Sequence, residues 1–400
     1  MEKNKKIFVL LPDGVGLRNF VFGDFFNTGK QAGFDITYWN GTPFDFSKTN
    51  FQSVDLGKAV SHPLSQIYKN VRKHVELDRN KKLSNDTVYD SYKFPYRYNG
   101  IKNIFKSLSA QALIPLYRSD SAYNRLRNKI ENLERKTSFY QHCLETLKRE
   151  KPDLVFCSNQ RHSSSIAPLL AAKDLNIPTV TFIFSWDNLP KAADYYFVWS
   201  DHMKMELLHY YPFIKEEQIK VCGTPQFEPH YDSKLLLSRE DFCRKYELDI
   251  QKKYLCYSGD DITTSPDDEK YLADLAQTIR NLNQKGANYG LIFRQCPVDF
   301  SDRYDAVLQE FKNEIVALNP VWEKGLNSWQ GILPTQEDII LQVNTIAHSE
   351  MVFNLGSSMV FDYATFGKPC AFVHYNPENA RVKNHTQKVY KYIHFKSMPS

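Results

Sequence analysis

The sequence predicts an α/β protein built from two tandem, doubly wound, Rossmann-like domains. Short apolar strands alternate with helical stretches over most of the chain, which is typical of parallel sheets. This series occurs twice, and a polar joint at residues 229–238 separates the two occurrences. A length of 400 residues fits two or three domains, and 42% hydrophobic with 24% charged residues is the composition of a folded globular protein.

We expect the first domain to cover residues 1–228. Its elements are predicted as a strand at 7–11, a helix at 19–32 and a strand at 35–39, then a strand at 153–157, a helix at 164–175, strands at 179–184 and 195–199, a helix from 201 and a strand at 220–222.

The second domain is expected over residues 229–400. Its strands are predicted at 254–258, 289–294, near 331, 351–354 and 370–373, and its helices at 267–285, 335–348 and 357–366. Doubly wound sheets bind ligands at the carboxyl ends of their strands, so we expect the chemistry in a cleft that the two domains face.

A basic, aromatic-rich helical insertion is predicted at about residues 58–151. It contains 20 Lys and Arg against 9 Asp and Glu, a net charge of +11, so the remainder of this +5 chain carries −6. The composition suits an anionic membrane surface or a phosphorylated acceptor. A solvated helical face with its own small core explains it equally well.

The location expected from the sequence is the cytoplasm, with peripheral contact at the inner face of a membrane through the insertion. No apolar run approaches the roughly 18 residues of a membrane span, and the basic N-terminus lacks the apolar core of a signal peptide. The seven cysteines are odd in number and widely spaced, which favours neither a disulfide framework nor a zinc site.

The most informative motif follows the predicted strand at 351–354. Gly356, Ser357 and Ser358 introduce a helix there, and a helix N-terminus with free N–H groups suits a phosphate. Simple capping of the helix by Ser357 is the alternative. Asp362, one turn further along, is a candidate partner for a ribose or sugar hydroxyl, with solvent-exposed decoration equally open.

Two further positions lie where strands of the second domain end. Arg294 can make paired hydrogen bonds to phosphate oxygens, although a surface ion pair is the alternative. Gly259 precedes two acids and permits close approach of the backbone to a ligand. The acids themselves could equally cap a turn.

Asp13 and Asp187 are the candidate general bases. Asp13 follows the first strand in the turn Asp13-Gly14-Val15-Gly16, which lacks the third glycine of the dinucleotide fingerprint. Asp187 follows the strand at 179–184, and the neighbouring Trp186 could raise its pKa by desolvation. Turn formation and capping explain these two residues about as well as catalysis does.

Several of these segments resemble GT-B glycosyltransferases, especially the CDP-glycerol glycerophosphotransferase and capsular-polysaccharide branch. The similar segments are Ser357 to Ala364 with Gly367-Lys368-Pro369, Gly223-Thr224-Pro225-Gln226-Phe227 at the domain joint, Arg294 before Cys296-Pro297, and Ser185 to Leu189. The resemblance adds Gly223 and Thr224 to the donor site. The sequence departs from the branch at Cys296, where the branch usually has histidine. It also lacks the helices that usually follow the Gly-Lys-Pro strand, so the chain is expected to be either a short member or truncated.

The expected function is a metal-independent, inverting glycosyltransferase. It would move a sugar or polyol phosphate from a nucleotide-activated or CDP-polyol donor to a glycan or lipid-linked hydroxyl, as in bacterial capsule or surface-polysaccharide synthesis. No cofactor, metal or nucleic-acid partner is expected, because the sequence lacks Asp-x-Asp, His-Glu-x-x-His and Walker motifs. Two alternatives remain, namely a nucleotide-sugar 2-epimerase and a non-catalytic nucleotide- or glycan-binding module.

Overall fold

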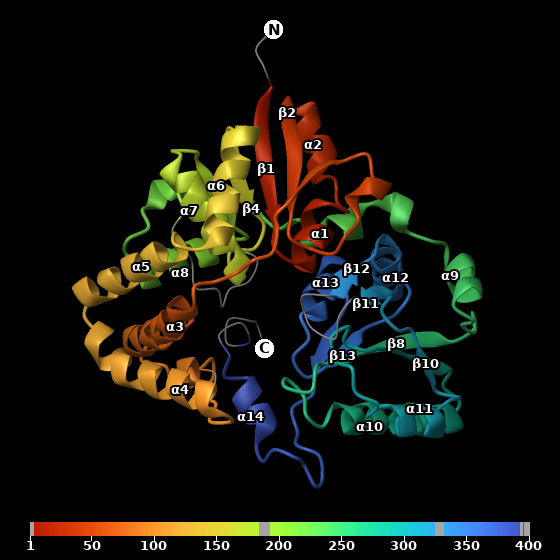
Figure 1. Ribbon diagram of the computed structural model, residues 1–400. Helices are drawn as coiled ribbons and strands as arrows, with labels where there is room; N and C mark the ends of the chain where they lie inside the picture. The colour runs from red at the N-terminus through yellow and green to blue at the C-terminus, as the bar shows by residue number, and fades with distance from the viewer. Residues whose placement is uncertain (1–3, 94, 184–192, 325–331, 393–394, 396–400) are drawn as a thin grey trace. The chain divides into compact units, whose positions relative to one another are not determined.

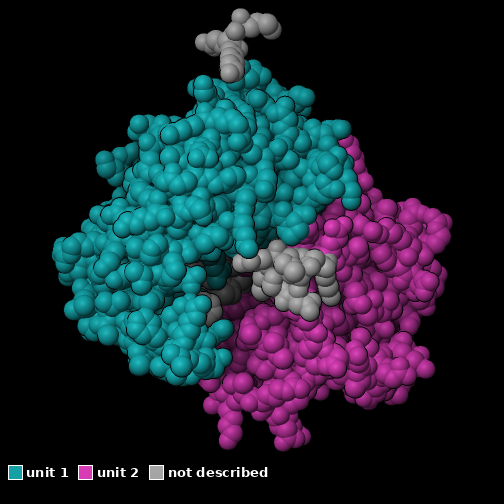
Figure 2. Space-filling model, in the orientation of Figure 1, with its two compact units in different colours: residues 1–224 teal, residues 225–400 magenta. Residues whose placement is uncertain are grey.

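The structure is a computed structural model that describes residues 4–93, 95–183, 193–324, 332–392 and 395 (Figure 1). The chain divides into two compact units, unit 1 at Met1–Thr224 and unit 2 at Pro225–Ser400 (Figure 2). Each unit holds its own parallel sheet covered by helices. The predicted fold class, two Rossmann-like α/β domains, is therefore confirmed.

Unit 1 contains a parallel sheet that has seven strands within the described residues, in the order β3-β2-β1-β4-β5-β6-β7. The chain builds outward from β1 in one direction and then from β4 in the other, so the winding direction reverses between these two strands. The strands are β1 (Lys5–Leu11), β2 (Phe34–Asn40), β3 (Gln52–Asp55), β4 (Leu154–Cys157), β5 (Thr179–Phe182), β6 (Tyr195–Val198) and β7 (Ile219–Val221).

The helices of unit 1 pack around this sheet and extend away from it in a helical part formed by α3 to α5 (Figure 1). They are α1 (Gly14–Phe20), α2 (Phe25–Gln31), α3 (Pro63–Ser84), α4 (Ile101–Leu113), α5 (Asp120–Glu134), α6 (Ser138–Glu150), α7 (Ile166–Asp174) and α8 (Asp201–Tyr210). The helical part has its own core, in which Val71 of α3, Ala110 of α4 and Leu126 of α5 are fully buried.

Unit 2 contains a parallel sheet with five strands among the described residues, in the order β10-β9-β8-β13-β14, together with the antiparallel pair β11-β12. Its strands are β8 (Lys253–Ser258), β9 (Tyr289–Arg294), β10 (Ile315–Ala317), β11 (Trp322–Lys324), β12 (Ile332–Pro334), β13 (Val352–Asn354) and β14 (Cys370–Phe372). The winding direction reverses between β8 and β13.

Helices cover both faces of the sheet in unit 2. Tyr254 and Cys256 of β8 pack in one core cluster, whereas Leu255 and Tyr257 pack in another, because successive strand residues point to opposite faces. The helices of unit 2 are α9 (Arg239–Lys245), α10 (Asp268–Gln284), α11 (Asp305–Glu310), α12 (Gln336–Ala347), α13 (Met359–Thr365) and α14 (His385–Val389).

The predicted single helix at 19–32 is wrong. Asp13 caps α1 by accepting a hydrogen bond from the Gly16 amide, so this helix starts earlier than predicted, and the chain breaks near Gly23 before α2 begins. No helix among the described residues is long and apolar enough to cross a membrane.

Candidate nucleotide-binding site

The reversal between β8 and β13 brings several predicted donor-site residues together in unit 2. The Ser258 hydroxyl donates to Ser357 Oγ at 2.9 Å, and the Gly356 amide donates to Asp260 Oδ2 at 2.8 Å. The Gly259 amide donates to the Arg294 carbonyl at 2.9 Å. The ends of β8, β9 and β13 are thus joined where doubly wound sheets bind ligands.

The loop before α13 has much of its hydrogen bonding satisfied within the protein. The Ser357 amide donates to Asn354 Oδ1 at 3.0 Å, and the Met359 amide donates to Ser357 Oγ at 3.3 Å. Ser357 therefore acts in part as the helix-capping residue that the alternative interpretation foresaw. Ser358 is exposed, and its side chain makes no capping hydrogen bond in the described part of the chain.

Asp260 contacts this loop and forms a buried acidic pair with Asp268. Its amide donates to Asp268 Oδ2 at 3.1 Å, and the hydroxyls of Tyr304 and Tyr257 donate to Asp268 at 2.7 and 2.9 Å. Burial raises the pKa of Asp260 well above the ordinary aspartate value, and the nearby Asp268 charge adds to this effect. Burial also raises the pKa of Asp268. The pair therefore retains a proton at a pH where exposed aspartates have lost theirs.

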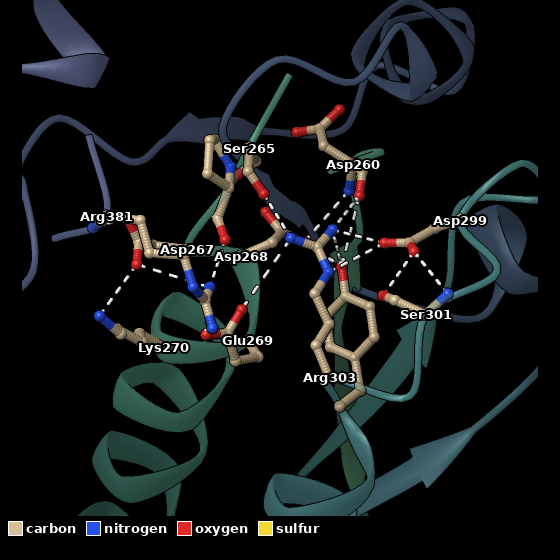
Figure 3. A network of polar contacts seen from close by, with 12 residues as sticks. Asp260, Ser265, Asp267, Asp268, Glu269, Lys270, Asp299, Ser301, Arg303 and Arg381 are labelled. Atoms are coloured by element: carbon tan, nitrogen blue, oxygen red, sulfur yellow. Dashed lines mark hydrogen bonds and ion pairs between the residues drawn. The ribbon is translucent and has the colours of Figure 1, made fainter. Parts of the chain in front are cut away.

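Arg303, which sequence reasoning missed, ties the loops after β8 and β9 together (Figure 3). Its guanidinium lies between Asp299 and Ser265, and donates to Asp299 Oδ2 from Nε at 2.9 Å and to the Asp260 carbonyl at 2.6 Å. These contacts fix the backbone of Asp260 and thereby the position of its carboxylate. The residues next to Arg303 in the sequence form no motif that would predict such a role.

Arg294 ends β9 and is paired inside unit 2. It is 6% exposed, and its Nη2 donates to both carboxylate oxygens of Asp338 at 2.7 and 2.8 Å. Asp338 also accepts from the Val321 amide at 2.9 Å and from Trp322 Nε1 at 2.6 Å. Arg294 Nη1 is buried and has no hydrogen-bond partner among the described residues.

Asp362 is buried and held by two side chains. His230, in the 3₁₀ segment Pro225–Tyr231, contacts Asp362 Oδ1 through Nε2 at 2.8 Å, and Gln342 donates to Oδ2 at 3.2 Å. The decorated-surface interpretation of Asp362 is therefore wrong. Sequence reasoning missed this role of His230, because His230 and Asp362 are 132 positions apart and form no local pattern.

The corresponding reversal in unit 1, between β1 and β4, holds Asp13. Asp13 follows β1 and accepts from Asn159 Nδ2 at 2.5 Å, and Asn159 comes shortly after β4. Burial raises the pKa of Asp13, while the hydrogen bond from Asn159 opposes that rise. A polar residue placed directly after a buried strand is the signal by which Asn159 could have been found.

Close packing explains the glycine at position 16, in the turn that follows Asp13. A Cβ at Gly16 would lie 2.5 Å from Ser158 Oγ, so the residue must be small for α1 to approach β4. This requirement explains Gly16 without a bound dinucleotide.

Three predicted positions remain, Gly223, Thr224 and Asp187. Gly223, with φ of +72°, and Thr224 end unit 1 after β7. Asp187 and the similar segment Ser185 to Leu189 lie outside the described residues. Burial raises the pKa of Cys296 to about 12, so this thiol, where the resembling branch has histidine, stays protonated at neutral pH.

Solved structures similar to this chain have a GT-B-like fold. One UDP-N-acetylglucosamine 2-epimerase is 12% identical, with a TM-score of 0.51, and the match covers 94% of this chain and 80% of that one. A putative UDP-N-acetylglucosamine 2-epimerase from Listeria monocytogenes is 11% identical, with a TM-score of 0.50 and the same coverage. The wall teichoic acid polymerase TagF is 14% identical over 56% of this chain and 53% of its own, with a TM-score of 0.32. No protein-family model and no curated protein matches the sequence.

The comparisons confirm the GT-B-like fold and correct the expected function. The glycosyltransferase assignment is wrong, because the similar structures that cover nearly the whole chain are 2-epimerases, and TagF is too dissimilar to support the transferase branch. The motifs misled for a physical reason. A phosphate-binding motif predicts that a nucleotide binds. It does not predict which reaction the attached sugar undergoes.

Proposed function

We propose that the chain is a nucleotide-sugar 2-epimerase that acts on UDP-N-acetylglucosamine or a close relative. The observation that carries the proposal is the likeness to two such structures over 94% of the chain. The switch-point clusters in both units support it, since doubly wound sheets bind nucleotides at these positions.

We assign the nucleotide diphosphate to the loop before α13 in unit 2. The exposed Ser358 hydroxyl is a donor of the kind that phosphate oxygens accept. The raised pKa of Asp260, caused first by burial, fits this assignment. A neutral carboxyl group beside the loop avoids repelling a diphosphate that a carboxylate would repel.

Inverting the C2 centre of a sugar requires that the C2–H bond breaks and that hydrogen returns to the opposite face. When a base removes the C2 proton, the C2–H electron pair forms a C1=C2 double bond and the nucleoside diphosphate leaves from C1. A proton then adds to the opposite face of C2 as the diphosphate bonds to C1 again, so one base and a proton donor on the other face are needed. We assign the role of the base to Asp13. Its raised pKa, caused first by burial, brings proton uptake and release closer to neutral pH. Asn159 positions the carboxylate.

The test is incubation of the purified protein with UDP-N-acetylglucosamine alone. Chromatography should detect UDP-N-acetylmannosamine without any acceptor present. Asp13→Asn should lower kcat at least about a hundredfold, the usual minimum contribution of a general acid or base. Asparagine is a good helix N-cap, so the melting temperature should stay unchanged.

Other results would decide against the proposal. Nucleotide binding with no epimer formed would leave the non-catalytic module as the function. An Asp13→Asn variant with full activity would remove Asp13 from the mechanism while leaving the epimerase assignment intact.

A further inference from the structure

Helix α4 buries its small residues and exposes its large apolar ones. Ser107 and Ala110 are buried against the rest of the helical part. Ile101, Phe105 and Leu108 are 87%, 64% and 55% exposed. Burial of apolar area stabilises a fold, so a helix packed only within its own chain would have the opposite arrangement.

The exposed apolar residues form one continuous stripe. Ile101, Ile104, Phe105 and Leu108 recur at intervals of three and four residues, which places them on one face of the helix. Leu116, in the 3₁₀ segment Ile114–Tyr117 that follows, extends the stripe with 66% exposure, and Tyr98 precedes it with 53%. We call these six residues the α4 patch.

The charged residues of the segment that contains the α4 patch are all basic. Residues 91–119 contain no Asp or Glu and five basic residues, and three of these, Arg97, Lys102 and Arg118, are exposed. An amphipathic helix with an apolar stripe and basic flanks is typical of segments that lie in the headgroup region of anionic bilayers.

The position of α4 within unit 1 suits such contact. In Figure 1, α4 lies at the end of the helical part that is farthest from β1, β2 and β4. Its buried side packs on α3, and Lys106 Nζ donates to Gln66 Oε1 at 2.9 Å. The helix is thus held to unit 1 from one side only, with the α4 patch on the other.

We propose that the α4 patch docks on an anionic lipid bilayer, with its apolar residues inserted among the acyl chains and its basic flanks on the headgroups. Docking does not depend on the proposed epimerase activity. It would keep the protein at a membrane surface by a contact separate from the nucleotide site.

The experiment is cosedimentation of the full chain with vesicles of two compositions. We expect binding to phosphatidylcholine mixed with phosphatidylglycerol and none to phosphatidylcholine alone. The double variant Ile101→Ser/Phe105→Ser should bind at least about tenfold more weakly, because two exposed apolar anchors are lost. Lys102→Glu should weaken binding at least about fivefold and reduce its sensitivity to salt.

The matched control is Ile250→Ser/Leu282→Ser, which removes two exposed apolar residues of unit 2, 41% and 40% exposed. This control should bind vesicles as the wild type does, and circular dichroism should show both double variants folded. Equal loss in the control, or no binding of wild type to anionic vesicles, would overturn the proposal. So would a wild-type dimer in light scattering that Ile101→Ser/Phe105→Ser converts to monomer, because the patch would then join two copies of the chain.

Discussion

At the scale of single residues, buried ion pairs determine which charged side chains near the candidate site already have partners within the protein. Arg294 and Asp338 are both nearly inaccessible, and each would carry an uncompensated charge without the other. Breaking such a pair costs more than its formation gains, because the remaining ion stays desolvated. The pair therefore fixes α12 to the end of β9.

Asp338→Asn should lower the free energy of unfolding by about 3 kcal/mol, since it leaves the Arg294 charge buried without its counterion. Urea unfolding measures this change. The matched variant is Glu217→Gln, which removes an exposed pair with Lys215 and should change the free energy by less than about 0.5 kcal/mol. Equal effects in the two variants would mean that Arg294 does not depend on Asp338.

Asp260 should make the stability of the protein fall as pH rises. Burial raises its folded-state pKa above the ordinary value, so between these two values the folded state binds a proton that the unfolded state has released. The contribution is complete below the ordinary pKa and is lost as pH rises through the folded-state pKa.

Asp260→Asn should therefore flatten the decline in unfolding free energy above about pH 4, measured by urea unfolding across a pH series. Asn keeps an oxygen that can accept from the Gly356 amide. Asp302→Asn, at an exposed position, is the control and should leave the slope unchanged. A steeper slope in Asp260→Asn than in the wild type would show that the carboxyl group is ionised in the folded protein.

At the scale of elements, apolar strands were predictable because hydrophobic runs bounded by polar turns are local signals. β1, β9 and β13 lie close to where the sequence predicts them. β3 and β10 were missed. β3 is mostly exposed and β10 has only one buried residue, so neither shows the apolar run by which the other strands were predicted.

The residues of the candidate site were only partly predictable, for a related reason. Gly259, Arg294 and Ser357 could be found because each ends a strand or follows one closely. Their partners could not, since Asp338 and His230 meet Arg294 and Asp362 only through long-range packing. A sequence pattern predicts where strands end. It does not predict which side chains form ion pairs or hydrogen bonds with one another there.

The two serines before α13 separate capping from ligand binding. Ser357→Ala should lower the free energy of unfolding by about 1 kcal/mol, because it removes the contacts with Ser258 and the Met359 amide. Ser358→Ala should leave stability unchanged and raise the KM for UDP-N-acetylglucosamine about fivefold, the worth of one hydrogen bond. An unchanged KM in Ser358→Ala would exclude Ser358 from the nucleotide site.

At the scale of the whole molecule, the same architecture occurs twice and places a polar cluster at each reversal of winding. In unit 1 the cluster is Asp13 with Asn159, and in unit 2 it is Asp260 with the loop at Gly356 and Ser357. In both clusters burial raises the pKa of an aspartate, Asp13 in unit 1 and Asp260 in unit 2.

The most direct test of this account is the reaction of the full chain with UDP-N-acetylglucosamine in D₂O, followed by proton NMR. Removal and return of the C2 proton should place deuterium at C2 of the epimer, with no acceptor added. Asp13→Asn should abolish this exchange while still binding UDP. Absence of both deuterium and epimer in the wild type, with the nucleotide sugar demonstrably bound, would contradict the epimerase assignment.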